Sequence, residues 1–321
     1  MMTSAIPDGV KLEEVDCPMG CPRDDEVVLV GRDRLHDLPG EYSIVRCRRC
    51  ELMRTTPRPS ADTIGFYYPD SYGPYATTRV QDDAAATGPA SSGRFARLWP
   101  ALFEPKTHAL PPLEPGRALE VGCGSGSFLH SLALRGWTVE GIEFSATAAK
   151  AARALGYPVH CGSLEQAPPP GGPLDLVVGW MVLEHLHEPI AALRKLASWS
   201  APGAHLVASV PDAAAPEFRV FGEDWYALHL PAHLFHYTPR TLRALLAAGG
   251  WTVQRLLWHD NPNNLLLSLD HRWRARGHTV RADLARAMAA GARWPRARFV
   301  LGKLMGATRT SGRLTVWATR T

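Results

Sequence analysis

The chain has 321 residues, of which 45% are hydrophobic, and its 35 basic and 31 acidic side chains leave a net charge of +4. This length holds one large α/β domain and a small appendage. No apolar run reaches the roughly 18 residues of a membrane-spanning helix, so none is expected. The charge is too small and too scattered to indicate nucleic acid as a partner. The polar N-terminus lacks an apolar signal stretch, so we expect a cytoplasmic protein.

Two closely spaced cysteine pairs occupy the first fifty residues. Cys17 and Cys21 are separated by three residues, and Cys47 and Cys50 by two. Four thiolates at such spacings can close a tetrahedral shell around Zn²⁺, and a closed shell is structural because it leaves no position for water. Two disulfides or four unrelated thiols are the alternatives, and the missing export signal disfavours disulfides. We therefore expect a small zinc-binding domain at residues 1–56.

The next segment, residues 57–93, is expected to connect the two domains. A short helix is expected at residues 60–68, beginning at Ser60. An aromatic run at 66–75 follows, which we interpret as a lid, with packing between domains as the alternative. Residues 76–93 are rich in Ala, Thr, Ser, Gly and Asp and predict a flexible linker. Residues 57–93 thus form a lid and linker, and an amphipathic helix is expected at 94–110.

From residue 117 onward, strand and helix patterns alternate. Strands are expected at 118–121, 139–142, 159–161, 174–178, 205–210, 252–258 and 313–319, and helices at 127–135, 146–155, 189–199 and 239–248. This alternation predicts an α/β fold: a Rossmann-like, doubly wound, parallel sheet of seven strands. An Arg-rich helical insertion is expected at about 262–310, within a domain that spans 94–321.

A glycine turn follows the first of these strands. Gly122, Gly124 and Gly126 alternate with Cys123 and Ser125, and the next strand ends at Glu143. Such a turn lets the backbone approach a ligand, and an acidic residue at the tip of the following strand can hold both hydroxyls of a ribose. The pattern predicts a nucleoside-containing cofactor. A nicotinamide dinucleotide is the alternative, but the alternating glycines lack the two-residue gap that its pyrophosphate turn requires.

Four segments together resemble the class I S-adenosylmethionine-dependent methyltransferases: 120–126, 141–145, 174–186 and 202–206. The resemblance covers about residues 115–260. The cysteine pairs and the segment 225–238 resemble bacterial small-molecule methyltransferases with an N-terminal zinc-binding domain, the sugar C-methyltransferases among them. We expect no additional C-terminal domain of the kind that those sugar enzymes carry, so the resemblance does not fix the substrate.

The resemblance implies a set of cofactor-binding residues. Glu143 is expected to hold the ribose, Phe144 to pack on the adenine, and Glu120 to orient the methionine end of the cofactor. For Phe144, Trp180 and Met181, plain core packing is the alternative. Ser163 stands where family members often carry an acidic residue for the adenine. The full set is Glu120, Gly122, Cys123, Gly124, Gly126, Glu143, Phe144, Ser163, Leu164, Trp180 and Met181.

Methyl transfer from a sulfonium is an in-line displacement that needs alignment, and a base when the acceptor carries a proton. His233 is the first candidate because the sugar enzymes place a histidine near the acceptor there, although Ala232 replaces their preceding Glu. His236 and His229 come next. A metal on these three histidines is disfavoured because Pro231 interrupts any helix that would align them.

The aromatic run adds one candidate to this site. Tyr72 is expected to contact either the methionine carboxylate or the acceptor. We thus expect an S-adenosylmethionine-dependent methyltransferase (EC 2.1.1.-) with structural zinc, acting on a small-molecule acceptor such as a sugar or natural-product intermediate. The alternatives are a zinc-assisted RNA methyltransferase and a non-catalytic cofactor-binding module. The sequence leaves open the atom methylated and the oligomeric state.

Overall fold

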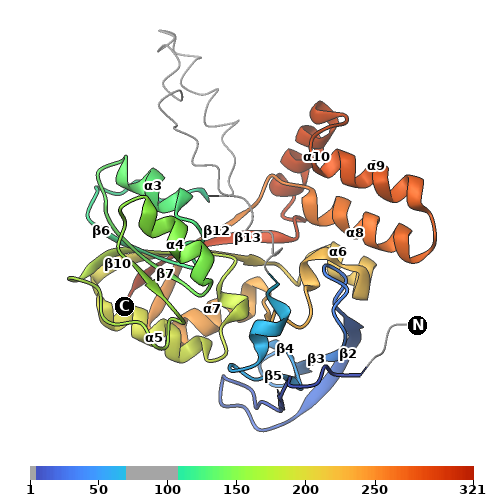
Figure 1. Ribbon diagram of the computed structural model, residues 1–321, viewed down its shortest axis with the longest axis horizontal. Coiled ribbons are helices and arrows are strands. Elements are labelled where there is room, and N and C mark those ends of the chain that lie inside the picture. Colours follow the sequence, from blue (N-terminus) through green and yellow to red (C-terminus); the bar gives the residue numbers. More distant parts are fainter. Residues whose placement is uncertain (1–4, 70–107) are drawn as a thin grey trace.

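The computed structural model describes residues 5–69 and 108–321. Its centre is a seven-stranded sheet in the order β12-β13-β10-β9-β6-β7-β8 (Figure 1). The strands are β6 (Arg117–Val121), β7 (Thr138–Glu143), β8 (Val159–Cys161), β9 (Leu174–Trp180), β10 (Ser200–Pro211), β12 (Trp251–Trp258) and β13 (Arg313–Arg320). The expected Rossmann-like sheet of seven strands is confirmed. The expectation that it is entirely parallel is wrong, because β13 pairs antiparallel with both β10 and β12.

Helices cover both faces of this sheet. On one face, α3 (Ser127–Ala133) and α4 (Ala146–Ala154) bury Leu129, Leu132 and Ala152 against the strands. On the other, α5 (Pro189–Trp199) and α7 (Pro239–Ala248) bury Leu193 and Leu245. Each fully buried leucine contributes roughly 1.5–3 kcal/mol relative to an exposed one. Two apolar layers therefore hold the sheet rigid beneath its carboxyl edge.

The helix starts follow their predicted capping residues. Ser145 Oγ accepts a hydrogen bond from the Ala148 N–H, 3.3 Å away, at the start of α4. Thr238 and Thr241 form a reciprocal capping box at the start of α7, which ends at Gly249. Such caps satisfy backbone donors that have no partner inside the helix. Local sequence thus sets both boundaries, as expected.

The N-terminal unit contains β1 (Leu12–Glu13), β2 (Asp25–Arg32), β3 (Glu41–Cys47), β4 (Met53–Thr55) and β5 (Arg58–Pro59). The helix expected at 60–68 is a shorter 3₁₀ helix, η1 (Ile64–Tyr67). The linker expected at 76–93 and most of the helix expected at 94–110 lie outside the described residues. Because β5 pairs with β1, the unit extends past residue 56.

A later segment completes this unit. β11 (Phe235–His236) pairs with β4, which gives a sheet in the order β11-β4-β3-β2. Tyr42 and Ile44 share a core with Phe218 and Trp225, from α6 (Pro216–Phe221) and the chain just after it. Two short 3₁₀ helices follow α6, η5 (Gly222–Asp224) and η6 (Tyr226–Leu228). The N-terminal unit is therefore packed against the chain that leaves β10.

The insertion between β12 and β13 is helical, as expected. It consists of α8 (Asn263–Ala275), α9 (Thr279–Ala289) and α10 (Pro295–Ala307). Asp270 of α8 is fully buried and bonds Arg274 at 2.8 Å and Arg286 at 3.1 Å.

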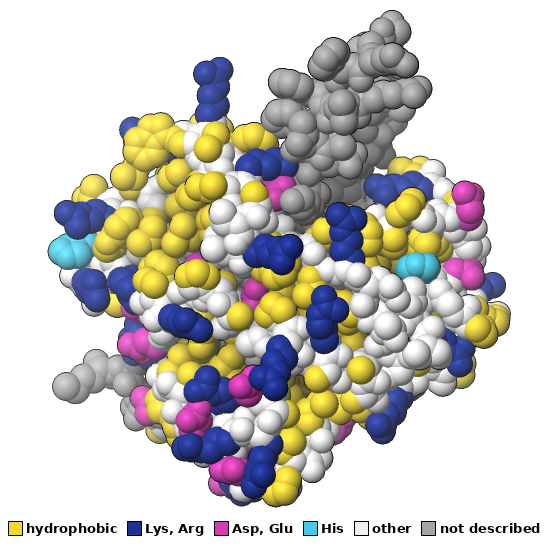
Figure 2. All heavy atoms as spheres, turned by 180° about the vertical axis from the view of Figure 1, so that it is seen from behind, with side chains coloured by type: hydrophobic (Ala, Val, Ile, Leu, Met, Phe, Trp, Pro, Cys, Tyr) yellow, Lys and Arg dark blue, Asp and Glu magenta, His cyan; other side chains and the backbone are white. Residues whose placement is uncertain are grey.

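On the face in Figure 2, Lys and Arg side chains are dispersed among neutral and acidic ones. Among the described residues, no helix has the length and apolar character needed to cross a bilayer.

Candidate functional site

A cavity of about 1090 Å³ lies at the carboxyl ends of β6, β7, β8 and β9. One wall comes from the sheet edge and the other from the N-terminal unit, through the loop after β2, η1 and Tyr68. η4 (Leu183–His185) and η6 line its deep end, and Arg313 reaches it from the start of β13. Open α/β sheets bind ligands at this edge. The cavity is therefore the candidate site.

The glycine turn forms one side of the cavity. Gly122 has φ +69°, and a Cβ there would lie 2.7 Å from Val182 Cγ2. The Gly122 and Cys123 N–H groups both donate to the Ile142 carbonyl, at 2.8 and 3.1 Å. The Cys123 side chain is 6% exposed and packs in the core. Among the expected turn residues, Gly122 thus lines the cavity, whereas Cys123, Gly124 and Gly126 shape the bend behind it.

Glu143 lines the cavity from the end of β7. Its Oε1 accepts the Ser145 N–H and its Oε2 the Gly124 N–H, each at 2.7 Å. These bonds fix the carboxylate and leave one lone pair on each oxygen, an arrangement suited to two neighbouring hydroxyls. Burial raises the pKa of Glu143, against the lowering effect of its backbone hydrogen bonds.

Glu120 lies behind Glu143 and is 2% exposed. Its Oε2 has no hydrogen-bond partner among the described residues. Burial, and then the charge of Glu143, raises its pKa well above the usual range. A buried carboxyl that has an unpaired oxygen and a raised pKa has no cation beside it. Glu120 is not among the residues that line the cavity, so its expected contact with the methionine end of S-adenosylmethionine stays a prediction.

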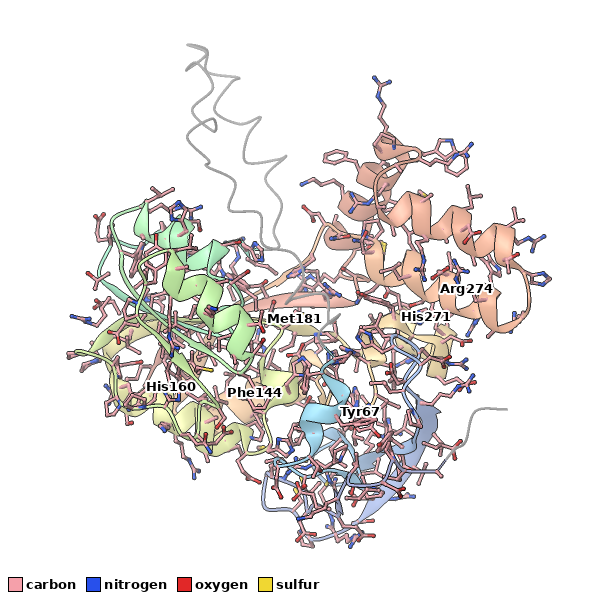
Figure 3. All side chains as sticks on the ribbon, in the orientation of Figure 1. Tyr67, Phe144, His160, Met181, His271 and Arg274 are labelled. Carbon is pink, nitrogen blue, oxygen red and sulfur yellow. The ribbon has the colours of Figure 1, made fainter. Side chains whose placement is uncertain are left out.

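The other expected cofactor residues lie along the same cavity: Phe144, Ser163, Leu164, Trp180 and Met181. Phe144 is 52% exposed, so it is not a core residue, and its ring centre lies 6.3 Å from that of Tyr68. Trp180 packs edge-on against Phe128, with ring centres 5.1 Å apart. Figure 3 shows Phe144 and Met181 between the sheet and the N-terminal unit that carries Tyr67.

Three histidines gather at the deep end of the cavity: His185, His229 and His233. His233 Nδ1 lies 2.9 Å from the Ala227 carbonyl, and His185 Nδ1 lies 2.9 Å from the Ala232 carbonyl. His229 Nδ1 is 3.3 Å from His233 Nε2. Burial lowers the pKa of His185 to about 4, that of His229 to about 3, and that of His233 well below its ordinary value. All three imidazoles are therefore neutral near pH 7.

Glu184 lies beneath these histidines and is fully buried. Its Oε1 is 4.0 Å from His233 Nε2, and neither carboxylate oxygen has a hydrogen-bond partner among the described residues. Burial raises the pKa of Glu184 to about 8. A carboxyl in this setting is costly unless another group joins it. The cluster is thus chemically incomplete at Glu184.

One other catalytic candidate, His236, does not line the cavity. His236 is fully buried in β11, and its Nε2 lies 3.2 Å from Thr55 Oγ1, which ties the N-terminal sheet to the rest of the chain. Tyr72 falls outside the described residues. Tyr68, from the same aromatic run, lines the cavity, and its hydroxyl lies 2.8 Å from His185 Nδ1.

Several cavity residues had no clear signal in the sequence. Arg313 comes from the last strand, and its Nε has no hydrogen-bond partner in the part of the chain that the structure describes. His36 comes from the loop after β2, with its ring centre 6.2 Å from that of His229. These residues are far apart in the chain, so only the folded structure brings them together.

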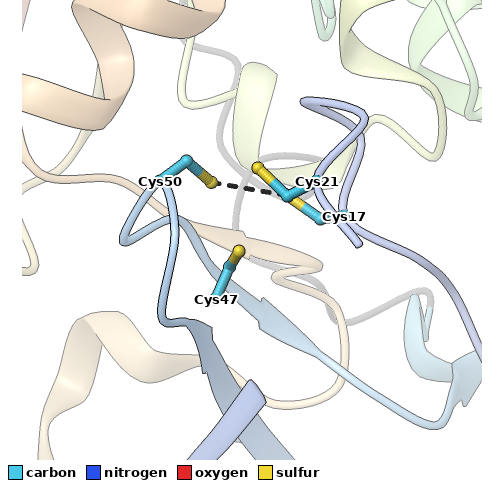
Figure 4. Close-up of side chains that lie close together, drawn as sticks. All are labelled: Cys17, Cys21, Cys47 and Cys50. Atoms are coloured by element: carbon cyan, nitrogen blue, oxygen red, sulfur yellow. Dashed lines mark hydrogen bonds between the residues drawn. The ribbon is translucent and has the colours of Figure 1, made fainter. Parts of the chain in front are cut away.

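The four N-terminal cysteines form a second site (Figure 4). Their sulfur atoms all lie within 4.8 Å of one another, with Cys17 Sγ and Cys50 Sγ 3.4 Å apart. All four are free thiols. Tetrahedral Zn²⁺ with Zn–S bonds of about 2.3 Å separates its sulfurs by roughly 3.8 Å. The donor set and spacing therefore fit a zinc ion.

Comparisons with known proteins agree with this geometry. A family model described as a methyltransferase domain matches residues 93–256. The chain is 33% identical over 175 residues to a ubiquinone biosynthesis O-methyltransferase of Xanthomonas axonopodis pv. citri, covering 47% of this chain and 72% of the relative. Against the protein of the same name in Xanthomonas euvesicatoria pv. vesicatoria, identity is 32% over 146 residues. That match covers 42% of this chain and 61% of the relative, less than two thirds of its length.

Solved structures give weaker matches. A crystal structure of an S-adenosylmethionine dependent methyltransferase from Mesorhizobium loti is 20% identical, with a TM-score of 0.45, over 69% of this chain and 97% of that one. Magnesium protoporphyrin IX methyltransferase from Synechocystis PCC 6803 with bound SAH is 18% identical, with a TM-score of 0.41, over 64% of this chain and 75% of that one.

Proposed function

This chain belongs to the S-adenosylmethionine-dependent methyltransferases, and from that premise we propose that it methylates a small molecule held at the histidine end of the cavity. The main support is that one continuous cavity joins Glu143 to His185, His229 and His233. Its volume of about 1090 Å³ exceeds the roughly 300–1,000 Å³ of ordinary ligand pockets. It therefore has room for a cofactor and an acceptor together.

The cofactor, in this proposal, lies along the sheet edge. Glu143 holds the ribose hydroxyls, and Phe144 packs on the adenine, with Ser163 and Leu164 beside it. The methionine end passes over Gly122, toward the carboxyl of Glu120. Trp180 and Met181 form the wall behind the sulfonium. S-adenosylmethionine supplies an electrophilic methyl group, so the residues around it need only align the displacement and exclude water.

The acceptor then lies against the histidines. Their neutral imidazoles can accept a hydrogen bond or a proton from an acceptor hydroxyl, and we place His233 first, with His229 beside it. Oxygen is the atom we favour, because the relatives that match are named O-methyltransferases. A sugar or natural-product intermediate with several hydroxyls suits the mixture of polar and aromatic residues lining this end.

Zinc, in this proposal, has a structural role. It joins the cysteine turns of the N-terminal unit, which covers the cavity through Ile64 and Tyr68. Four thiolates would fill its coordination shell, so the metal takes no part in the methyl transfer. Losing it should loosen the cover of the cavity.

The experiment is transfer of a labelled methyl group. The purified chain is incubated with methyl-labelled S-adenosylmethionine and a panel of hydroxylated aromatic compounds and sugars, and products are identified by mass spectrometry. Formation of a methylated product together with S-adenosylhomocysteine supports the proposal. Absence of measurable binding of either cofactor form by calorimetry would reject it.

A further inference from the structure

We propose that Glu184, His185 and His233 bind a divalent transition-metal ion at the acceptor end of the cavity, separate from the cysteine site. One ligand atom from each of these residues lies within 4.8 Å of the other two. A metal with bonds of about 2.0–2.2 Å holds its ligands roughly 3–3.5 Å apart. Closing the set around an ion therefore requires side-chain movements of only about an ångström.

The ring orientations already suit metal binding. Carbonyl oxygens only accept hydrogen bonds, so the Ala227 carbonyl, 2.9 Å from His233 Nδ1, fixes the proton on that nitrogen. His185 Nδ1 lies 2.9 Å from the Ala232 carbonyl and 2.8 Å from the Tyr68 hydroxyl, so this nitrogen carries the proton when the hydroxyl accepts from it. His233 Nε2 thus carries a lone pair, and His185 Nε2 does so in that tautomer. A ligand histidine whose other nitrogen donates to a carbonyl is the usual arrangement around protein metals.

Glu184 supplies the independent observation. It is fully buried, and neither of its oxygens has a hydrogen-bond partner among the described residues. Buried carboxylates are normally paired, hydrogen-bonded or bound to a metal. Arg313 lines the same cavity, and its charge lowers the pKa of Glu184 against the effect of burial, but it forms no ion pair with Glu184 in the described ranges. A cation between Glu184 and the two imidazoles would complete the set.

The donor set indicates the class of metal. One carboxylate and two imidazoles suit Mn²⁺, Fe²⁺, Co²⁺ or Zn²⁺, whereas Mg²⁺ and Ca²⁺ prefer oxygen ligands. Three protein ligands leave coordination positions open. Because His185 and His233 line the cavity, those positions would face the acceptor.

The proposed metal site also limits the chemical class of the acceptor, and this step of the inference rests on the proposed methyl transfer. A hydroxyl bound to the metal becomes more acidic. When the metal takes His233 Nε2, His233 holds the acceptor through the ion instead of acting as the base, and the hydroxyl proton passes to solvent. The acceptor oxygen then forms its bond to the methyl carbon as the bond from carbon to sulfur breaks, releasing S-adenosylhomocysteine. The acceptor class is thus an alcohol or phenol able to coordinate a metal.

The test measures metal binding without catalysis. The full chain, with zinc already on its cysteines, is titrated with Co²⁺ by calorimetry and visible absorption. We expect one further equivalent of Co²⁺ whose spectrum lacks a thiolate-to-cobalt band. Glu184→Gln should weaken it by more than about 100-fold, beyond the usual cost of losing an outer-shell partner. Glu217→Gln, a buried carboxyl bonded to Trp225 instead, is the control and should bind as wild type.

Each outcome bears on the site. No second equivalent, or equal affinity in Glu184→Gln, overturns the proposal. If Glu184→Gln fails to fold, His185→Asn provides the same comparison. Calorimetry with S-adenosylhomocysteine and methyl transfer after chelation are measured separately. Full activity in protein that holds zinc only at the cysteines would overturn the catalytic role of the second metal and leave the proposed methyl transfer intact.

Discussion

Replacing Glu143 with Ala tests the cofactor site most directly. The carboxylate accepts the Ser145 and Gly124 N–H groups at 2.7 Å each, so its oxygens are fixed toward the cavity. In the proposed complex, both oxygens also accept a ribose hydroxyl. Hydrogen bonds to charged groups are worth about 1.5–3 kcal/mol each. Losing two of them should weaken S-adenosylhomocysteine binding by about 150- to 20,000-fold.

Calorimetry with two ligands separates this effect from damage to the turn. The second ligand is S-adenosylhomocysteine without its ribose 2′-hydroxyl. In the wild type, the missing hydroxyl should cost about 10- to 150-fold in affinity. In Glu143→Ala it should cost less than about threefold, because its partner is already gone. Glu140→Ala is the control, since Glu140 lies on the same strand but bonds Arg117 at 3.0 Å.

The reasoning is refuted if the missing hydroxyl costs the same in wild type and variant. Glu143 would then stabilise only the turn, through the backbone N–H groups of Gly124 and Ser145. A uniform loss of affinity for both ligands would be the signature of that structural role. Full retention of affinity in Glu143→Ala would remove the residue from the site altogether.

Three further predictions follow from the same structure. Gly122→Ala should lower the melting temperature more than Gly156→Ala. Both glycines have positive φ, but a Cβ at Gly122 would lie 2.7 Å from Val182 Cγ2, whereas a Cβ at Gly156 would meet no atom within 4 Å. Cys47→Ser should remove one zinc per chain by elemental analysis and lower the melting temperature, whereas Cys161→Ser, outside the cluster, should retain the metal. Burial raises the pKa of Glu217 to about 7, so its stabilising contribution is complete below about pH 4 and is lost as the pH rises through 7. The free energy of unfolding of Glu217→Gln, measured with denaturant, should therefore rise by about 3 kcal/mol relative to that of wild type between pH 4 and pH 8. A difference between the two proteins that stays constant over this range would contradict the prediction.

Much of the fold could be read from the sequence because its signals are local. Alternating apolar strands, the caps at Ser145 and Thr238, and the glycines near 122–126 each act within a few residues. The antiparallel β13 could not be found this way. Strand direction depends on which neighbour a segment joins after 50 residues of helical insertion, and the apolar alternation of β13 is the same in either direction.

The candidate site likewise has one part that the sequence predicts and another part that it does not. Gly122 and Glu143 lie in one contiguous strand-turn-helix-strand unit, so their spacing predicts their proximity. The acceptor end draws on Tyr68, His185 and Arg313, which are separated by more than a hundred residues in each case. No periodicity links such positions. The histidine segment itself was recognisable from the sequence. Which histidine lines the cavity (His233) and which is buried against Thr55 instead (His236) depends on β11 joining the N-terminal sheet.

The pairing of β11 with β4 explains why the two ends of the cavity are built from different parts of the chain. The cofactor end belongs to the sheet, whose strands would place Glu143 and Gly122 together in any fold of this topology. The acceptor end exists only where the N-terminal unit packs on the chain after β10, with Thr55 Oγ1 donating to the His233 carbonyl at 2.8 Å. The cysteine turns, β4 and β11 are continuous with that contact. In the proposed function, acceptor binding therefore depends more strongly on the folding of the cysteine-bearing unit than cofactor binding does, so removal of the proposed zinc should impair acceptor methylation before it impairs cofactor affinity.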